Sequence, residues 1–187
     1  MTLEQELKHM ANGDLYYQTP ELLELRFKVR DLLYQYNRLN YRDLSGRKQL
    51  LSKIFKHIGH HCFVEIPFHI DYGINTTLGE NFFANNNLTI LDAAPVTIGN
   101  DVLIAPNVGI YTAGHALDPQ VRRKTGAEFG LPVTIGNNVW LGCYGDSRSD
   151  NWRKQRHWCR IGCYQGHSGQ RLSLWGSRKS YPKTRTN

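Results

Sequence analysis

A six-residue repeat runs through the middle of this chain. Apart from residues 113–132, an aliphatic residue opens each hexad from Leu78 onward, usually followed by a small or polar residue, and the pattern stops at Gly142. The hexads open at Leu78, Ala84, Ile90, Ile98, Ile104, Ile110, Ile135 and Leu141. An inward aliphatic residue at this period, with Gly and Asn at corners that need unusual backbone angles, is typical of a parallel β-helix.

An ordinary β-sandwich is the alternative interpretation of this region. Its strands would alternate with a period of two and recur every 8 to 12 residues or so, which is not the period seen here. Residues 113–132 contain no hexad but several Gly and Pro residues. We expect them to form a functional loop, because a loop of that length inside a compact repeat is uncommon otherwise.

The N-terminal third has helical rather than hexad patterning. Apolar spacing predicts helices over residues 3–11, 20–37 and 44–57, the second with Pro20 at its start. Residues 61–70 follow as a β-rich segment in which Phe63, Glu65 and Phe68 alternate. We therefore expect a helical cap over residues 1–60, a β-helix over residues 61–142 with the loop 113–132, and a separate tail over residues 143–187.

The net charge of +7 is concentrated in that tail. Residues 143–187 carry ten Lys and Arg against two Asp, whereas residues 1–142 carry 13 basic and 14 acidic residues. The charge of the whole chain therefore does not predict binding to nucleic acid or to an anionic membrane. No signal peptide or transmembrane segment is recognisable, so we expect a cytoplasmic protein.

Several motifs together resemble the maltose and galactoside O-acetyltransferase family. They are the hexads, the long insertion after Ala113-Gly114-His115, the Leu-Pro-Val-Thr-Ile-Gly-Asn-Asn-Val-Trp segment at 131–140, and Gly13-Asp-Leu-Tyr16 followed by Asn37. The resemblance covers residues 3 to 142. It implies a mainly β fold, a left-handed parallel β-helix with an N-terminal α-helical cap, and acetyl-CoA as co-substrate without a metal. It also implies a homotrimer with active sites between subunits.

The resemblance assigns the general base to His115, which matches the histidine of the family's Gly-His motif. A base is needed because a sugar hydroxyl is a poor nucleophile at neutral pH, and an imidazole accepts its proton and returns it to the leaving thiolate. Glu128 matches a glutamate near that histidine and is expected to orient it; a solvated loop charge is the alternative.

Further residues match acceptor and coenzyme contacts of the family. Asp71 and Asn85 match acceptor contacts, with a turn cap and a corner asparagine as the structural alternatives. Trp140 matches a tryptophan lining the acceptor and coenzyme cleft, with a core-capping role as its alternative, and the backbone amide of Cys143 matches an oxyanion donor. An acidic acceptor contact of the family appears here as Ala93, with Asp92 adjacent, and an acidic residue of the cap appears as Tyr17.

The predicted function is transfer of an acetyl group from acetyl-CoA to a hydroxyl of a sugar or galactoside. One alternative is a catalytically dead β-helix scaffold, which would differ in not binding acetyl-CoA. A second alternative is a xenobiotic O-acetyltransferase of the same fold, against which the helical cap argues.

The tail lacks the composition of a β-helix. It contains no Val or Ala and holds three of the four Cys and three of the four Trp. Codons for it can be chosen so that reading one nucleotide later yields GENSVIGAG, KDIPASVY and GGPAKVI in order, strings that resemble the closing coils of the family. We interpret the tail as out of frame and expect it to be disordered or non-native. A zinc site at His157, Cys159, Cys163 and His167 and a nucleic-acid arm are the alternatives.

Overall fold

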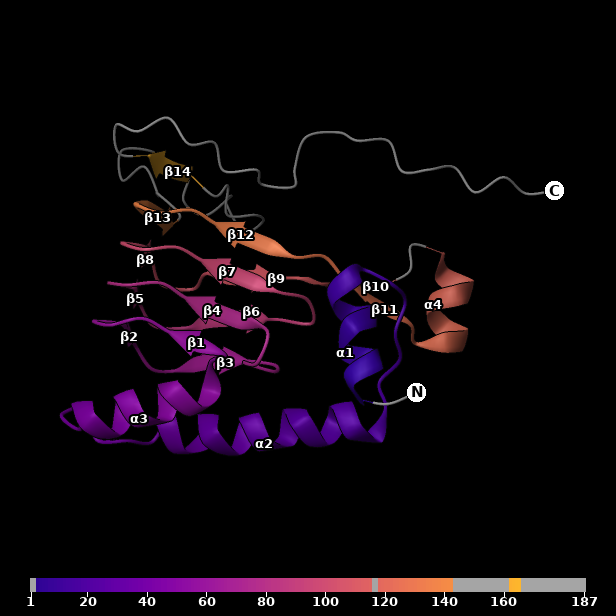
Figure 1. Cartoon of the computed structure of the whole chain (residues 1–187), viewed down its shortest axis with the longest axis horizontal. Coiled ribbons are helices and arrows are strands. Elements are labelled where there is room, and N and C mark those ends of the chain that lie inside the picture. Colours follow the sequence, from indigo (N-terminus) through magenta and orange to yellow (C-terminus); the bar gives the residue numbers. More distant parts are fainter. Residues whose placement is uncertain (1–2, 116–117, 143–161, 166–187) are drawn as a thin grey trace, which may run out of the picture.

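The structure is a computed structural model, and it describes residues 3–115, 118–142 and 162–165. Short strands wind into coils whose sides form three parallel sheets (Figure 1). The first sheet holds β1 (His57–Ile58), β4 (Thr76–Leu78), β7 (Val96–Ile98) and β12 (Val133–Ile135). The second sheet holds β2 (Phe63–Val64), β5 (Phe83–Ala84), β8 (Leu103–Ile104) and β13 (Val139–Gly142), and the third holds β3 (Phe68–Ile70), β6 (Leu88–Leu91) and β9 (Gly109–Tyr111). The prediction of a parallel β-helix is confirmed.

The aliphatic residues that open the hexads stack in register inside the helix. Leu78, Ile98 and Ile135 align across the first sheet, and Ala84, Ile104 and Leu141 align across the second. Ile90 and Ile110 align across the third, and all of these residues are buried. Burying each Leu or Ile of this set stabilises the fold by about 1.5–3 kcal/mol, so the hexad openers contribute a large part of the core.

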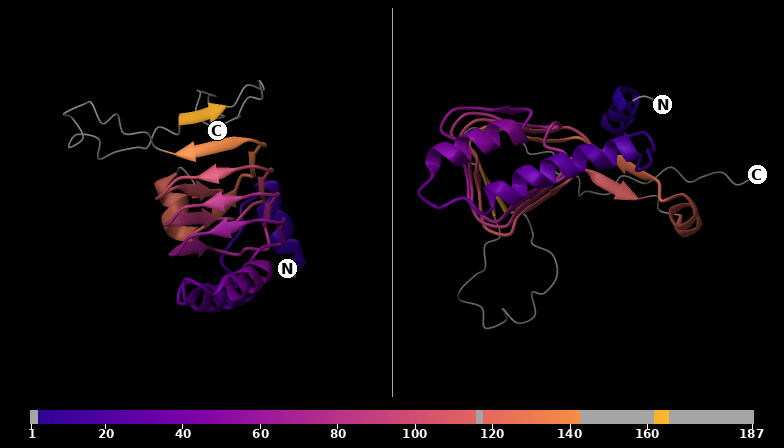
Figure 2. Two further views of the ribbon diagram at one scale, coloured as in Figure 1. Left: turned by 90° about the vertical axis from the view of Figure 1, so that its left-hand side faces the viewer. Right: turned by 90° about the horizontal axis from the view of Figure 1, so that it is seen from below.

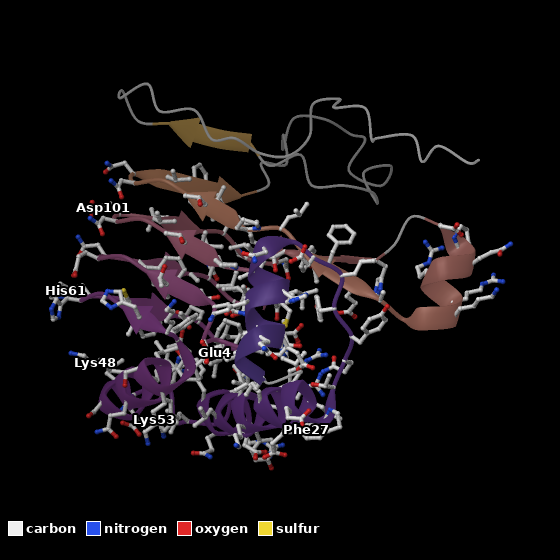
Figure 3. All side chains as sticks on the ribbon, turned by 45° about the vertical axis from the view of Figure 1, so that its right-hand side comes forward. Glu4, Phe27, Lys48, Lys53, His61 and Asp101 are labelled. Carbon is white, nitrogen blue, oxygen red and sulfur yellow. The ribbon has the colours of Figure 1, made fainter. Side chains whose placement is uncertain are left out.

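Asn and Gly have different roles at the turns between the sheets. Asn81 and Asp101 have positive φ, of 56° and 57°, and the amide of Asn81 donates a hydrogen bond of 2.9 Å to Asp101 on the next coil. Figure 3 shows His61, which also has positive φ, on the same edge as Asp101. Gly99 does not have positive φ; a Cβ there would lie 2.9 Å from the backbone carbon of Gly136. The sequence interpretation gave both residue types the same conformational role, and for Gly99 the reason is close approach of neighbouring coils.

Helices cover the lower end of the β-helix. α2 (Pro20–Tyr36) and α3 (Leu44–Ile54) lie beneath the first coil, and α1 (Leu3–Asn12) stands beside the coils (Figure 1). The hydroxyl of Tyr36 donates a hydrogen bond of 2.5 Å to the carbonyl of Val64, and the side-chain amide of Asn37 bonds the backbone of Phe68 through both its oxygen and its nitrogen. The cap is thereby fixed to β2 and β3.

The predicted third helix is three residues too long. α3 ends at Ile54, because Phe55 is extended, with φ −86° and ψ 145°. His57 and Ile58 instead form β1 and pair with Thr77 and Leu78. The first coil therefore begins before residue 61, the boundary that the sequence predicted.

Of residues 143–187, the structure describes β14 (Gly162–Gln165). This strand pairs with β13 in the antiparallel direction, whereas β13 pairs with β8 in parallel. The parallel order of the second sheet thus ends at β13 among the described strands. The rest of the tail, including most of the residues discussed as a zinc site, lies outside the described residues.

Candidate active site at one corner of the β-helix

The predicted loop 113–132 contains an antiparallel hairpin and a short helix. β10 (Ala113–His115) pairs with β11 (Glu128–Gly130), and α4 (Pro119–Thr125) lies between them. Seen from below in Figure 2, the coils enclose a triangular outline from which these elements project at one corner. Asp118 begins α4 by accepting a hydrogen bond of 2.7 Å from the amide of Gln120, a helix-start signal present in the sequence.

The chain leaves the third sheet and enters the first at this corner. We call residues 71–75, 92–95 and 112–132 the hairpin corner, because each segment joins a strand of the third sheet to one of the first. Asp71, Asp92, His115 and Glu128 belong to it. The fold therefore brings four of the predicted site residues to one corner.

His115 and Glu128 face each other across the hairpin. They are register partners, and Nε2 of His115 lies 3.9 Å from Oε1 of Glu128. The His115 side chain is 55% exposed and that of Glu128 is 30% exposed, so the imidazole is accessible from solvent. Gly114 allows this pairing, because a Cβ there would lie 2.6 Å from the ring of Phe129.

The N-terminal segment holds Glu128 from the other side. The amide of Tyr16 donates to the carbonyl of Glu128 at 2.9 Å, and the amide of Glu128 donates to the carbonyl of Tyr16 at 3.1 Å. The Tyr16 hydroxyl also donates a hydrogen bond of 2.6 Å to Oε2 of Glu128. Glu128 is thus bound between β10 and the segment that follows α1.

Asp71 is held by a residue of α2. Arg26 donates a hydrogen bond of 2.8 Å to Oδ1 of Asp71 and another of 3.0 Å to Gln18, and its guanidinium lies 5.7 Å from the ring centre of Tyr72. The Asp71 side chain remains 19% exposed. One carboxylate oxygen is thus fixed by an ion pair at the edge of the hairpin corner.

Asp92 is placed differently from the other three corner residues. Its carboxylate accepts hydrogen bonds of 2.8 Å from the amide of Tyr72 and 2.9 Å from the hydroxyl of Thr76, and it has no solvent exposure. Burial raises the pKa of Asp92 to about 6, against the opposing effect of these hydrogen bonds. This position corrects the expectation of an acceptor contact: Asp92 braces the turns of the corner from inside.

Asn85 and Trp140 lie elsewhere on the molecule. Asn85 follows β5, where the second sheet turns into the third, and its Oδ1 accepts a hydrogen bond of 2.8 Å from the amide of Asn86. Trp140 lies on the outside of the second sheet, in register with Leu103, which aligns with Phe83 and through it with Phe63. We call these four residues the outer row. It lies on the wall of the triangle opposite the hairpin corner. Cys143 lies outside the described residues.

Known proteins are similar to most of this chain. Residues 9–59 match the maltose acetyltransferase hexapeptide capping motif. A putative acetyltransferase of Saccharomyces cerevisiae is 45% identical over 138 residues, which is 73% of this chain and 70% of that protein.

The chain belongs to the maltose and galactoside O-acetyltransferase family.

Two further members of the O-acetyltransferase family bear on function. The galactoside O-acetyltransferase of Escherichia coli is 42% identical over 123 residues, which is 66% of this chain and 60% of that enzyme. A galactoside acetyltransferase solved in complex with coenzyme A superposes with a TM-score of 0.69 at 37% identity, covering 72% of this chain and 68% of that one. The fold is therefore the left-handed β-helix of hexapeptide-repeat acetyltransferases.

The described residues were also searched for metal-binding groups and membrane-spanning helices. Among them, no group of three or more His, Cys, Asp or Glu side chains is arranged to hold a metal ion. No helix in this part of the acetyltransferase chain is long and apolar enough to cross a membrane.

The sequence did not single out Tyr16 and Arg26 as members of the site. Both lie within the capping motif, and each bonds a carboxylate that the sequence did predict. The sequence did include Tyr16 in a family motif. That motif does not indicate that Tyr16 bonds Glu128, a residue 112 positions away.

Proposed function

We propose that this chain transfers an acetyl group from acetyl-CoA to a hydroxyl of a sugar or galactoside, with His115 as general base. The observation that carries the proposal is the pairing of an accessible imidazole with a carboxylate at the hairpin corner. It is supported by the family's galactoside acetyltransferase in complex with coenzyme A.

In the proposed reaction, the imidazole of His115 accepts the proton of the acceptor hydroxyl as the hydroxyl oxygen attacks the thioester carbonyl. A carbon–oxygen bond forms, and the carbon–sulfur bond breaks as the tetrahedral intermediate collapses. The imidazolium then returns the proton to the leaving thiolate, so the residue finishes in its starting state. Glu128 orients the imidazole for both steps, because its carboxylate Oε1 faces Nε2 of His115 at 3.9 Å.

The remaining proposed contacts surround this proton transfer. Asp71 accepts hydrogen bonds from sugar hydroxyls through the carboxylate that Arg26 orients. Asn85 contacts the acceptor through its side-chain amide nitrogen, and Trp140 supplies an apolar wall for acceptor and pantetheine. The backbone amide of Cys143 is the proposed donor to the oxyanion.

These contacts require more than one copy of the chain. Within one subunit the outer row, which includes Trp140, lies on the wall opposite the hairpin corner with His115. Leu103 and Trp140 are 50% and 44% exposed, and an exposed apolar row of this kind marks an interaction surface. The proposed homotrimer places the outer row of one subunit beside the hairpin corner of the next.

The function is tested with the full chain, acetyl-CoA and a panel of galactosides and maltose, by following release of the coenzyme A thiol with a chromogenic disulfide. Replacing the base in His115→Gln is expected to lower kcat at least about 100-fold, whereas His57→Gln, an exposed histidine of β1, serves as the matched control. Equal activity of His115→Gln and the wild type would contradict the mechanism. Calorimetric binding of acetyl-CoA without turnover on any acceptor would contradict the enzymatic function, and absence of binding would favour the scaffold.

A further inference from the structure

The hydroxyl of Tyr16 is the one side-chain donor that holds the Glu128 carboxylate among the described residues. Backbone pairing to β10 and to Tyr16 fixes the Cα of Glu128, but a glutamate side chain still rotates about three bonds. The hydrogen bond of 2.6 Å to Oε2 removes that freedom and leaves Oε1 directed toward His115. The orientation of the carboxylate therefore depends on a residue of the N-terminal cap.

We propose that Tyr16 is a positioning residue of the active site, which holds the Glu128 carboxylate against His115. The inference rests on the proposed role of His115 and extends it to a residue that does not touch the reacting atoms. It also gives the N-terminal segment a catalytic purpose, since α1 and residues 13–19 bring the phenol to the hairpin.

The environment of Tyr16 suits this role. The side chain is only 4% exposed and lies in an apolar cluster with Met10, Leu22 and Tyr72. Burial, and then the adjacent Glu128, raise the pKa of Tyr16, so the phenol keeps its proton and stays a donor. A short hydrogen bond to a charged acceptor in such surroundings is stronger than one between neutral groups.

The chain offers two matched controls for a Tyr16→Phe variant. Tyr41 of the cap also donates to a glutamate, Glu65, which follows β2, and Tyr36 donates from a fully buried position to the carbonyl of Val64. Tyr41→Phe removes the same kind of hydrogen bond away from the hairpin corner. Tyr36→Phe reproduces the loss of a buried hydroxyl, which separates reduced stability from altered positioning.

Two measurements on the full chain test the inference. In steady-state kinetics, Tyr16→Phe is expected to lower kcat by about 10-fold to 100-fold with the KM for acetyl-CoA unchanged, while Tyr36→Phe and Tyr41→Phe keep kcat. In the nitrogen–proton correlation spectrum of the histidine side chains, the His115 signals, assigned with His115→Gln, should move in Tyr16→Phe and stay in place in both controls.

The spectrum tests the positioning role of Tyr16 even if the chain shows no turnover. Failure of the proposed function is therefore distinguishable from failure of this inference. Unmoved His115 signals in folded Tyr16→Phe would overturn the positioning role. If Tyr16→Phe folds poorly, Glu128→Gln is used, which keeps an oxygen for the Tyr16 hydroxyl. Its His115 signals should move without a drop in Tm, and unmoved signals would again overturn the inference. Adding Tyr16→Phe to Glu128→Ala should cause no further loss of kcat, and an additional loss would show that Tyr16 acts through another group.

Discussion

The hydroxyl of Thr76 donates a hydrogen bond of 2.9 Å to the carboxylate of Asp92, and neither side chain is exposed to solvent. The two residues lie at the two ends of one coil, at the start of β4 and just after β6. A buried carboxylate with these partners makes the stability of the corner depend on pH.

Asp92→Asn should flatten that dependence. The folded protein raises the pKa of Asp92 from 3.8 to about 6, so it binds the proton more tightly than the unfolded chain does. This contribution is fully present below about pH 4 and is lost as the pH rises to about 6, by up to about 3 kcal/mol. Urea unfolding of both proteins from pH 4 to pH 8 measures it. A stability difference between the two proteins that does not change with pH would contradict the prediction.

Asn81→Ala should destabilise the coils by about 1–2 kcal/mol, because the alanine Cβ is strained at a φ of 56°. Asn81→Gly should cost less, since only the exposed hydrogen bond to Asp101 is then lost. Thermal unfolding compares the two variants. Both variants lack the hydrogen bond to Asp101, so a glycine variant less stable than the alanine variant would contradict the prediction that backbone conformation decides stability at this corner.

Arg26→Met should destabilise the fold by about 3 kcal/mol or less, because it leaves the partly buried Asp71 carboxylate without its cation. It should also raise the KM for the sugar while leaving the KM for acetyl-CoA unchanged. Arg30→Met, an exposed position on the same helix, is the control. A rise in the KM for acetyl-CoA alone would assign Asp71 to the coenzyme side of the site.

Leu103→Asp should convert the proposed trimer to monomers and abolish turnover, because it places a charge in the outer row between two copies. Leu44→Asp changes another exposed leucine, on the cap, and should leave assembly intact. Sedimentation and light scattering measure the assembly. Trimers of Leu103→Asp, or a monomeric wild type with full activity, would rule out the proposed arrangement of subunits.

The intact mass of the native protein should differ from the 21.5 kDa of these 187 residues. We expect the difference because the tail translates into family-like strings in the shifted frame. Resequencing the codons for Trp140 to Tyr144 is the accompanying measurement. A mass of 21.5 kDa with an unchanged gene sequence would reject the frame-shift hypothesis.

The part of the core inside the β-helix was predictable because the hexad repeat marks its own inward-facing positions. Each hexad from Leu78 to Leu141 opens with a residue that the structure buries in register, so period alone identified the inward positions. β1 was missed because Ile58 continues the apolar spacing of α3 as well as it stacks on Leu78. The helical period and the β-helix period both fit these residues, and only the pairing of β1 with β4 of the next coil distinguishes the two structures.

For the candidate site, the sequence indicated the residue types better than the contacts between them. His115 and Glu128 follow from a motif and a local hairpin, whereas the bond from Tyr16 joins segments far apart in the sequence. Asp92 was predicted to contact the acceptor because the sequence around an acidic residue beside a turn is the same whether its side chain faces solvent or the interior. Its burial depends on Tyr72 and Thr76, which lie 20 and 16 residues earlier in the chain, and no local pattern reveals them.

The strand that follows the hairpin, β12, pairs with β7 in the same register in which β7 pairs with β4. Val96, Thr97 and Ile98 align with Val133, Thr134 and Ile135, although 34 residues separate β7 from β12. Length and content of the chain can therefore change at this corner without shifting any other coil. Because Tyr16 bonds the hairpin, an exchange of residues 112–132 between relatives should include residues 13–19, and we expect such an exchange to change the proposed acceptor preference on an unchanged core.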